Sequence, residues 1–195
     1  QHVCELAKIM GTDRIRMFSF YLPEEGEPAQ YREEVLRRMR RMAEYAAAKN
    51  LILQHENEKG IYGDNAARCL DLMEEFYGPA FQCTFDFANF VQCRQDTLEA
   101  YDMLKPYISY IHVKDAMWED GMVVPAGMGD GHVAEILEKL DQNGYQGFLS
   151  LEPHLADFAG FKGLEQLSKA KGRSDGASAF CQAYAALVGL LENAI

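Results

Sequence analysis

The chain alternates short apolar segments with longer amphipathic ones, and this alternation restricts the possible folds more than any other feature. Five apolar segments have the length and composition of strands, at residues 14–21, 51–56, 81–87, 108–113 and 148–152. Segments with apolar residues at helical spacing follow them at 31–50, 64–77, 96–104, 132–143 and 175–193, with Asp64 expected as the N-cap of the second. This order is typical of parallel β-α-β units.

Two architectures are built from such units, an open doubly wound sheet and a (β/α)8 barrel. No GxGxxG motif follows a predicted strand, so the dinucleotide-binding form of the open sheet has little support. A length of 195 residues favours one α/β domain covering residues 1–195, with an irregular segment at 153–173. The first residues read like the end of a helix, so we expect the chain to begin inside a longer protein.

The charge and the cysteines exclude several classes of function. A net charge of −11 argues against a nucleic-acid partner, because phosphate binding relies on Lys and Arg. Five scattered cysteines without a CxxC pair are typical of a reduced, cytoplasmic protein. No apolar run approaches the roughly 18 residues of a membrane helix, so we expect no membrane partner.

Four predicted strands carry a metal-binding type of side chain at or near their C-terminal ends, namely Glu56, Asp86, His112 and Glu152. In parallel α/β sheets this edge is where ligands bind. Three carboxylates meeting there would repel one another unless a cation neutralised them. Oxygen donors with one imidazole suit one divalent ion, Mn²⁺, Mg²⁺ or Co²⁺, with Zn²⁺ as a further candidate.

Each of these residues also has a simpler interpretation. A single acid at a strand end is more often a helix cap or an ion-pair partner, and a single His there is more often a hydrogen-bonded core residue. Four such residues in register on consecutive strands favour the metal site. Arg16, on the first strand, is expected to be an internal ion-pair partner.

Four runs of sequence resemble the xylose-isomerase-like barrels, a family that includes ketose 3-epimerases, hydroxypyruvate isomerases and inosose dehydratases. They are HEN at 55–57, FDFANF at 85–90, IHVKD at 111–115 and the stretch at 124–154, within a resemblance over about residues 5–155. The resemblance implies a TIM barrel truncated to about the last five β/α units, with the N-terminal strands missing. Exposed sheet edges would then favour association, including a homo-oligomer.

The resemblance also implies a metal-dependent isomerase or epimerase of carbohydrate metabolism, acting on a small sugar or hydroxy-keto acid. It places the metal on the same four residues and makes Glu56 and Glu152 the catalytic pair that moves a proton through an enediolate. Asn89, Lys114 and His154 are expected to bind substrate. The chain departs from many relatives at Asn89, where they have His, and at Trp118, where epimerases often have Arg.

Three other functions remain open at this point. A dehydratase of inosose type would use the same site but expel water. An abasic-site endonuclease would need more His ligands and a basic groove, which five His and a net charge of −11 argue against. A non-catalytic sugar-binding protein is the third.

Overall fold

The computed structural model describes residues 1–155 and 175–194. Its helices and strands, in chain order, are α1 His2–Met10, β1 Arg14–Met17, α2 Pro28–Ala47, β2 Ile52–Glu56, α3 Ala66–Phe76, β3 Phe81–Asp86, α4 Phe87–Gln92, α5 Thr97–Leu104, β4 Ile108–Val113, β5 Asp115–Ala116, β6 Val123–Val124, α6 Val133–Gln142, β7 Phe148–Leu151 and α7 Gly176–Ala194. Most of the irregular segment predicted at 153–173 lies outside the described residues.

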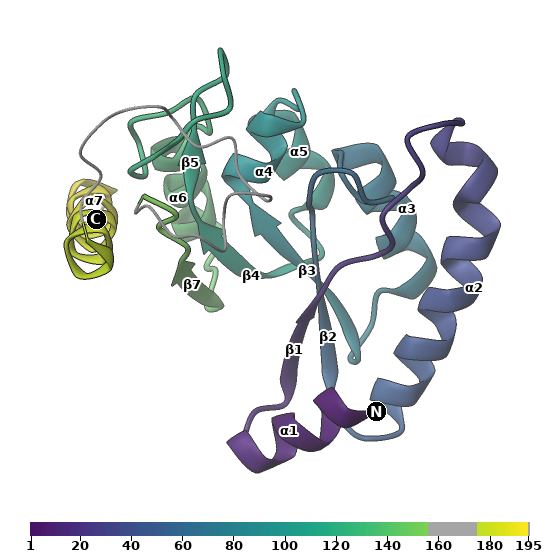
Figure 1. Ribbon diagram of the computed structural model, residues 1–195. Coiled ribbons are helices and arrows are strands. Elements are labelled where there is room, and N and C mark those ends of the chain that lie inside the picture. Colours follow the sequence, from purple (N-terminus) through teal and green to yellow (C-terminus); the bar gives the residue numbers. More distant parts are fainter. Residues whose placement is uncertain (156–174, 195) are drawn as a thin grey trace.

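The predicted parallel sheet is confirmed. Five strands pair in the order β1-β2-β3-β4-β7, and every pairing in this sheet is parallel. The strands follow one another around a curved half-barrel, with helices connecting them on the outside (Figure 1). This is the arrangement expected for part of a (β/α) barrel, because each right-handed crossover returns the chain to the next parallel strand.

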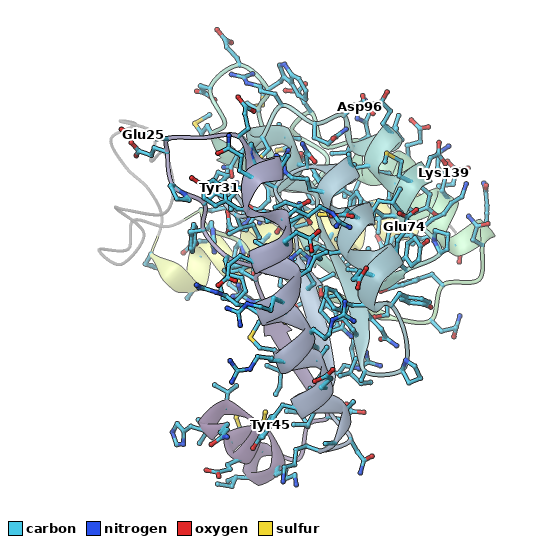
Figure 2. The ribbon with its side chains drawn as sticks, turned by 90° about the vertical axis from the view of Figure 1, so that its right-hand side faces the viewer. Glu25, Tyr31, Tyr45, Glu74, Asp96 and Lys139 are labelled. Atoms are coloured by element: carbon cyan, nitrogen blue, oxygen red, sulfur yellow. The ribbon has the colours of Figure 1, made fainter. Side chains whose placement is uncertain are left out.

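The two faces of the sheet differ in chemistry because side chains alternate along each strand. Leu53, Phe85 and Ile111 point to the helical side and join the main hydrophobic core. Helix α2 lies across this side, with Tyr31 and Tyr45 near its two ends (Figure 2). The neighbours of the core residues along the strands, such as Gln54 and Thr84, face the inner side. The inner face is therefore polar.

Several boundaries differ from those expected. Strand β1 ends at Met17, earlier than the predicted strand at 14–21. In the rest of that predicted strand, Tyr21 forms an isolated β-bridge with Ile61. Helix α3 has Asn65 as its N-cap, whose side chain accepts from the Arg68 backbone N–H, so the expectation for Asp64 was wrong. Asp64 instead pairs with the Arg68 side chain. Asn65, one residue later, has the extended backbone of an N-cap, so its side chain reaches the first helical turn and Asp64 forms an i,i+4 ion pair instead.

A short helix and a small hairpin were not expected from the sequence. Helix α4 begins directly after β3, and strands β5 and β6 pair antiparallel in the glycine-rich region. Asp115 anchors this region: its buried carboxylate accepts backbone N–H bonds from Ala116, Gly127, Gly129 and Gly131 at 2.8–3.0 Å. Among the described helices, none combines the length and apolar character needed to span a bilayer.

Candidate metal centre

The inner face of the sheet brings together the four side chains that the strand ends predicted. Glu56 and Asp86 end β2 and β3, His112 lies in β4 opposite Asp86, and Glu152 directly follows β7. One ligand atom from each residue lies within 4.8 Å of all the others. Glu56, Asp86 and His112 are buried and Glu152 is partly buried. The parallel pairing places all four side chains on one face at the same edge of the sheet, with a stagger of two residues between Glu56 and Asp86 and between His112 and Glu152.

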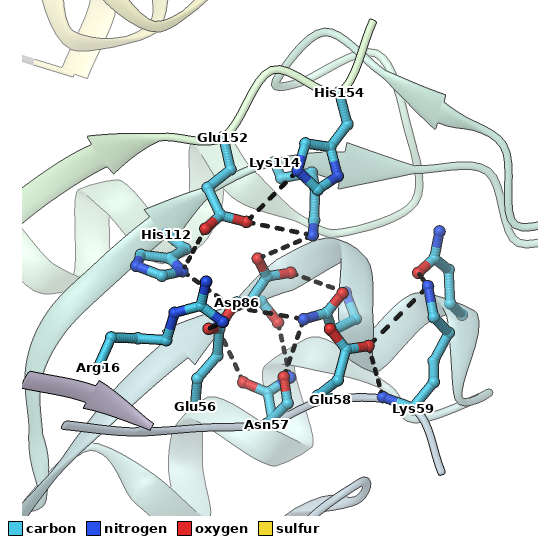
Figure 3. A network of polar contacts seen from close by, with 12 residues as sticks. Arg16, Glu56, Asn57, Glu58, Lys59, Asp86, His112, Lys114, Glu152 and His154 are labelled. Carbon is cyan, nitrogen blue, oxygen red and sulfur yellow. Dashed lines mark hydrogen bonds and ion pairs between the residues drawn. The ribbon is translucent and has the colours of Figure 1, made fainter. Parts of the chain in front are cut away.

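Ion pairs connect the four residues to one another and to two cations (Figure 3). His112 Nδ1 lies 2.8 Å from Glu56 Oε1 and 3.2 Å from Glu152 Oε1. Lys114 Nζ lies 3.4 Å from Asp86 Oδ2 and 3.5 Å from Glu152 Oε2. Arg16 Nη1 lies 3.2 Å from Glu56 Oε2, so the ion-pair role expected for Arg16 places it at the site itself.

The charge of the Asp86 carboxylate is not fully compensated by the groups around it. Burial, with Glu56 and Glu152 nearby, raises the pKa of Asp86 to about 7, although Lys114 opposes the shift. Burial lowers the pKa of His112, but the Glu56 hydrogen bond and the surrounding carboxylates outweigh it and raise that pKa overall. Burial raises the pKa of Glu152, but Lys114, His112 and His154 together lower it by more, so the net shift is downward. A further positive charge would stabilise this group.

The donor set fits a divalent cation. Glu56 Oε2 and Asp86 Oδ2 are buried and accept no hydrogen bond from any described residue, although Arg16 and Lys114 lie at ion-pair distance. Buried carboxylate oxygens without hydrogen bonds are costly, and metal coordination is one of the few ways to satisfy them. Three carboxylates and one imidazole match the preferences of Mn²⁺, Mg²⁺, Co²⁺ or Zn²⁺. These four residues could therefore hold one metal ion.

Asn57 positions Asp86, and sequence reasoning missed it. Its amide donates to the Asp86 carbonyl and accepts from the Asp86 backbone N–H, both at 2.9 Å. Asn89 completes the support, because its backbone N–H donates to Asp86 Oδ1 at 2.8 Å and its side chain donates to the Asn57 carbonyl at 2.9 Å. The signal was the asparagine directly after Glu56, but only the fold shows what it contacts.

The expected substrate-binding residues lie around the four ligands. Asn89 is buried, its Nδ2 is 3.5 Å from Glu56 Oε1, and its Oδ1 has no partner among the described residues. Lys114 lies between two of the carboxylates, and His154 Nε2 is 3.9 Å from Glu152 Oε2. Their contact with substrate remains a prediction.

His55, in the HEN run beside Glu56, lies away from the site. It points to the helical side, stacks on Phe81 at 6.2 Å between ring centroids, and is fully buried. A Cβ on Gly63 would lie only 2.5 Å from its ring. Burial lowers the pKa of His55 to about 4, so it is a neutral core residue at neutral pH.

Comparison with known proteins agrees with this geometry. Residues 1–173 match the family described as xylose isomerase-like TIM barrel. The chain is 26% identical over 110 residues to a 3-dehydroshikimate dehydratase from Bacillus anthracis, a match that covers 56% of this chain and 39% of that protein.

Solved structures share the fold at low sequence identity. The probable 3-DHS dehydratase AsbF from Bacillus anthracis superposes with a TM-score of 0.66 at 22% identity, covering 77% of this chain and 61% of that one. An L-ribulose 3-epimerase gives a TM-score of 0.76 at 18% identity, covering 99% and 66%. The chain thus spans less than two thirds of the length of these relatives.

Proposed function

Because the chain belongs to the xylose isomerase-like TIM barrel family, we propose that it is a divalent-metal-dependent enzyme that isomerises or epimerises a small sugar or hydroxy-keto acid. The observation that carries the proposal is the convergence of Glu56, Asp86, His112 and Glu152 within 4.8 Å at the C-terminal edge of the sheet. A divalent cation on these ligands supplies Lewis-acid polarisation of the substrate's carbonyl group.

Glu152 and Glu56 are proposed as the proton-transfer pair. Their carboxylates approach His112 Nδ1 from different strands, at 3.2 Å and 2.8 Å, so a substrate beside His112 would have one on each side. The lowered pKa of Glu152 keeps it ionised near neutral pH, which suits a group that removes a proton from carbon. Glu152 then returns this proton to the neighbouring carbon, or Glu56, after taking a proton from water, delivers one to the opposite face, so that the two steps move a hydrogen or invert a centre.

The neighbouring side chains orient the substrate in this proposal. The Oδ1 atom of Asn89, which has no partner among the described residues, accepts a hydrogen bond from a substrate hydroxyl. Lys114 donates to a substrate oxygen from its place between Asp86 and Glu152. His154, beside Glu152, also contacts the substrate. Asn89 cannot transfer a proton, so the acid–base chemistry rests on the two glutamates.

A proton-exchange experiment tests the proposal. The chain with Mn²⁺ and a panel of ketoses and hydroxy-keto acids in D₂O should incorporate deuterium at the carbon next to the substrate carbonyl, measured by NMR. Glu152→Gln should lower the exchange rate by about 10²-fold or more, because it removes the base. Glu58→Gln is the matched control, since Glu58 lies two residues beyond Glu56 but outside the four-residue cluster. Absence of exchange across the panel, with Mn²⁺ bound, would contradict the proposal.

A dehydratase is the second candidate, favoured by the similarity to a 3-dehydroshikimate dehydratase. It would use the same base to remove a proton and would then expel a β-hydroxyl as water. Mass spectrometry separates the two functions, because a dehydratase product is lighter by one water and an isomerase product has an unchanged mass.

A further inference from the structure

A small cavity on the inner face of the sheet adjoins the four metal-ligand candidates. Its volume is about 340 Å³, and His112 and Arg16 line it together with Arg14, Thr84 and Tyr110. This volume suits a small metabolite. No acidic residue is among the described residues that line it, and two of them are arginines. In a chain with a net charge of −11, a cavity of this composition favours an anionic ligand.

Arg16 belongs to both the site and the cavity. One guanidinium nitrogen contacts Glu56 Oε2 at 3.2 Å, while 47% of the side chain is exposed. Its guanidinium also lies over the Phe18 ring, with Cζ 4.6 Å from the ring centroid, which restrains the side chain. A guanidinium carries five N–H donors, so an ion pair with one carboxylate oxygen leaves donors that can face a ligand.

The net charge of the site also favours an anionic ligand. Glu56, Asp86 and Glu152 carry three negative charges when a metal binds them. Arg16 and Lys114 offset two of these charges, and a divalent cation more than offsets the third. With His112 neutral, as a metal ligand must be, one positive charge remains. A buried site favours neutrality, and a ligand with one carboxylate restores it.

Resting on the proposed function, we propose that the substrate carries a carboxylate that binds Arg16, so the substrate class is a small hydroxy-keto acid rather than a neutral ketose. The hydroxy-ketone part of this substrate lies at the four ligands, between Glu56 and Glu152. Its carboxylate extends toward the cavity and accepts hydrogen bonds from the Arg16 guanidinium. Arg14 also lines the cavity, two residues away on the same strand face and roughly 7 Å along the strand, and its guanidinium is hydrogen-bonded to Gln82 Oε1 at 3.4 Å.

Two three-carbon compounds test how much the substrate carboxylate by itself adds to the binding affinity. Hydroxypyruvate and dihydroxyacetone share a hydroxy-ketone and differ by a carboxylate in place of a hydroxymethyl group. Calorimetric titration of the Mn²⁺-loaded chain should show hydroxypyruvate binding at least about tenfold more tightly, the gain expected from charge-assisted hydrogen bonds. This readout is binding affinity and needs no turnover.

Variants of the two arginines locate the effect. Arg16→Gln should reduce the preference for hydroxypyruvate to within about twofold, and Arg16→Lys should retain part of it because the charge remains. Arg14→Gln is the matched control and should keep the full preference, since it removes the same charge from the same strand face. The affinity for Mn²⁺ alone is measured for every variant, so that effects on the metal are separated from effects on the ligand.

Each outcome decides a different claim. If Mn²⁺ does not bind, the proposed function fails and the substrate class fails with it. If Mn²⁺ binds and the two probes bind equally, the proposed function stands and the substrate class is overturned. If the preference for hydroxypyruvate survives in Arg16→Gln, or is lost equally in Arg14→Gln, the assignment of the carboxylate to Arg16 is overturned.

Discussion

At the scale of single residues, the Asp86 carboxylate both caps a helix and faces the candidate metal centre. Asp86 caps helix α4 by accepting the Asn89 backbone N–H through Oδ1, and it presents Oδ2 to the candidate metal centre. The helix-cap interpretation of an acid at a strand end is therefore correct for Asp86, and the cap leaves Oδ2 available for the proposed metal ion. The cap fixes the orientation of the carboxylate, which reduces the entropy lost when it binds a cation.

Asn57 should control metal affinity without contacting the metal. Asn57→Ala removes both hydrogen bonds to the Asp86 backbone, so we expect Mn²⁺ affinity to fall by about 10- to 100-fold. Calorimetry measures the affinity. Asn143→Ala is the control, because Asn143 also hydrogen-bonds a backbone carbonyl, that of Lys139 at the end of α6, and lies outside the four-residue cluster. Equal losses of affinity in the two variants would show a general effect of destabilisation instead.

His55 should make the free energy of unfolding depend on pH. Its pKa is about 4 in the folded chain against an ordinary histidine pKa of 6.5, so its contribution is complete above pH 6.5 and is lost as the pH falls toward 4. Between pH 7.5 and pH 5 this loss amounts to about 2 kcal/mol. Urea unfolding at both pH values measures it, and His55→Leu should reduce the pH dependence by that amount. An unchanged dependence in the variant would rule out this role.

At the scale of elements, the glycine-rich region between β5 and α6 depends on one carboxylate. Burial raises the pKa of Asp115, and the N–H groups of Gly129, Ala116, Gly131 and Gly127 oppose the shift. A Cβ on Gly131 would lie 2.6 Å from Asp115 Oδ1, so glycine is required for this close approach. The carboxylate therefore holds the loop between β5 and α6 in its conformation.

Replacing this anchor should loosen the whole loop. Asp115→Asn turns an acceptor of four N–H groups into a group that also donates, so we expect a loss of roughly 2–3 kcal/mol in the free energy of unfolding. Amide hydrogen exchange at Gly127, Gly129 and Gly131 should become faster. Asp120→Asn, which changes a single exposed hydrogen bond to Met122, should leave these amides protected. Unchanged protection in Asp115→Asn would contradict the anchor role.

Sequence periodicity predicted the elements that bury apolar faces and missed those held by polar contacts. The five strands and the meeting of their terminal acids follow from alternation and parallel register, which are local and regular properties. Helix α4 has six residues and the β5–β6 strands two each, too short for a periodic signal. The contacts of Asn57 and Asp115 join residues 29 and up to 16 positions apart, so only the folded chain brings them together.

At the scale of the whole molecule, β1 and β7 are the edges of the half-barrel's sheet within residues 1–155 and 175–194. Parallel edge strands carry unpaired backbone groups, and Phe148 on β7 is 59% exposed. We therefore expect this chain to associate as its concentration rises, which light scattering during size-exclusion chromatography measures. Phe148→Ser should weaken the association, whereas Trp118→Ser, in a loop away from the edge strands, should not. A monomer at every concentration would contradict this expectation.

The central claim is that four side chains from neighbouring strands hold one divalent cation, and a crystal structure of the chain grown with Mn²⁺ tests it most directly. Anomalous scattering should show one manganese ion within about 2.0–2.6 Å of atoms from Glu56, Asp86, His112 and Glu152. A structure with manganese bound elsewhere, or with these four side chains pointing apart and no ion between them, would contradict the account.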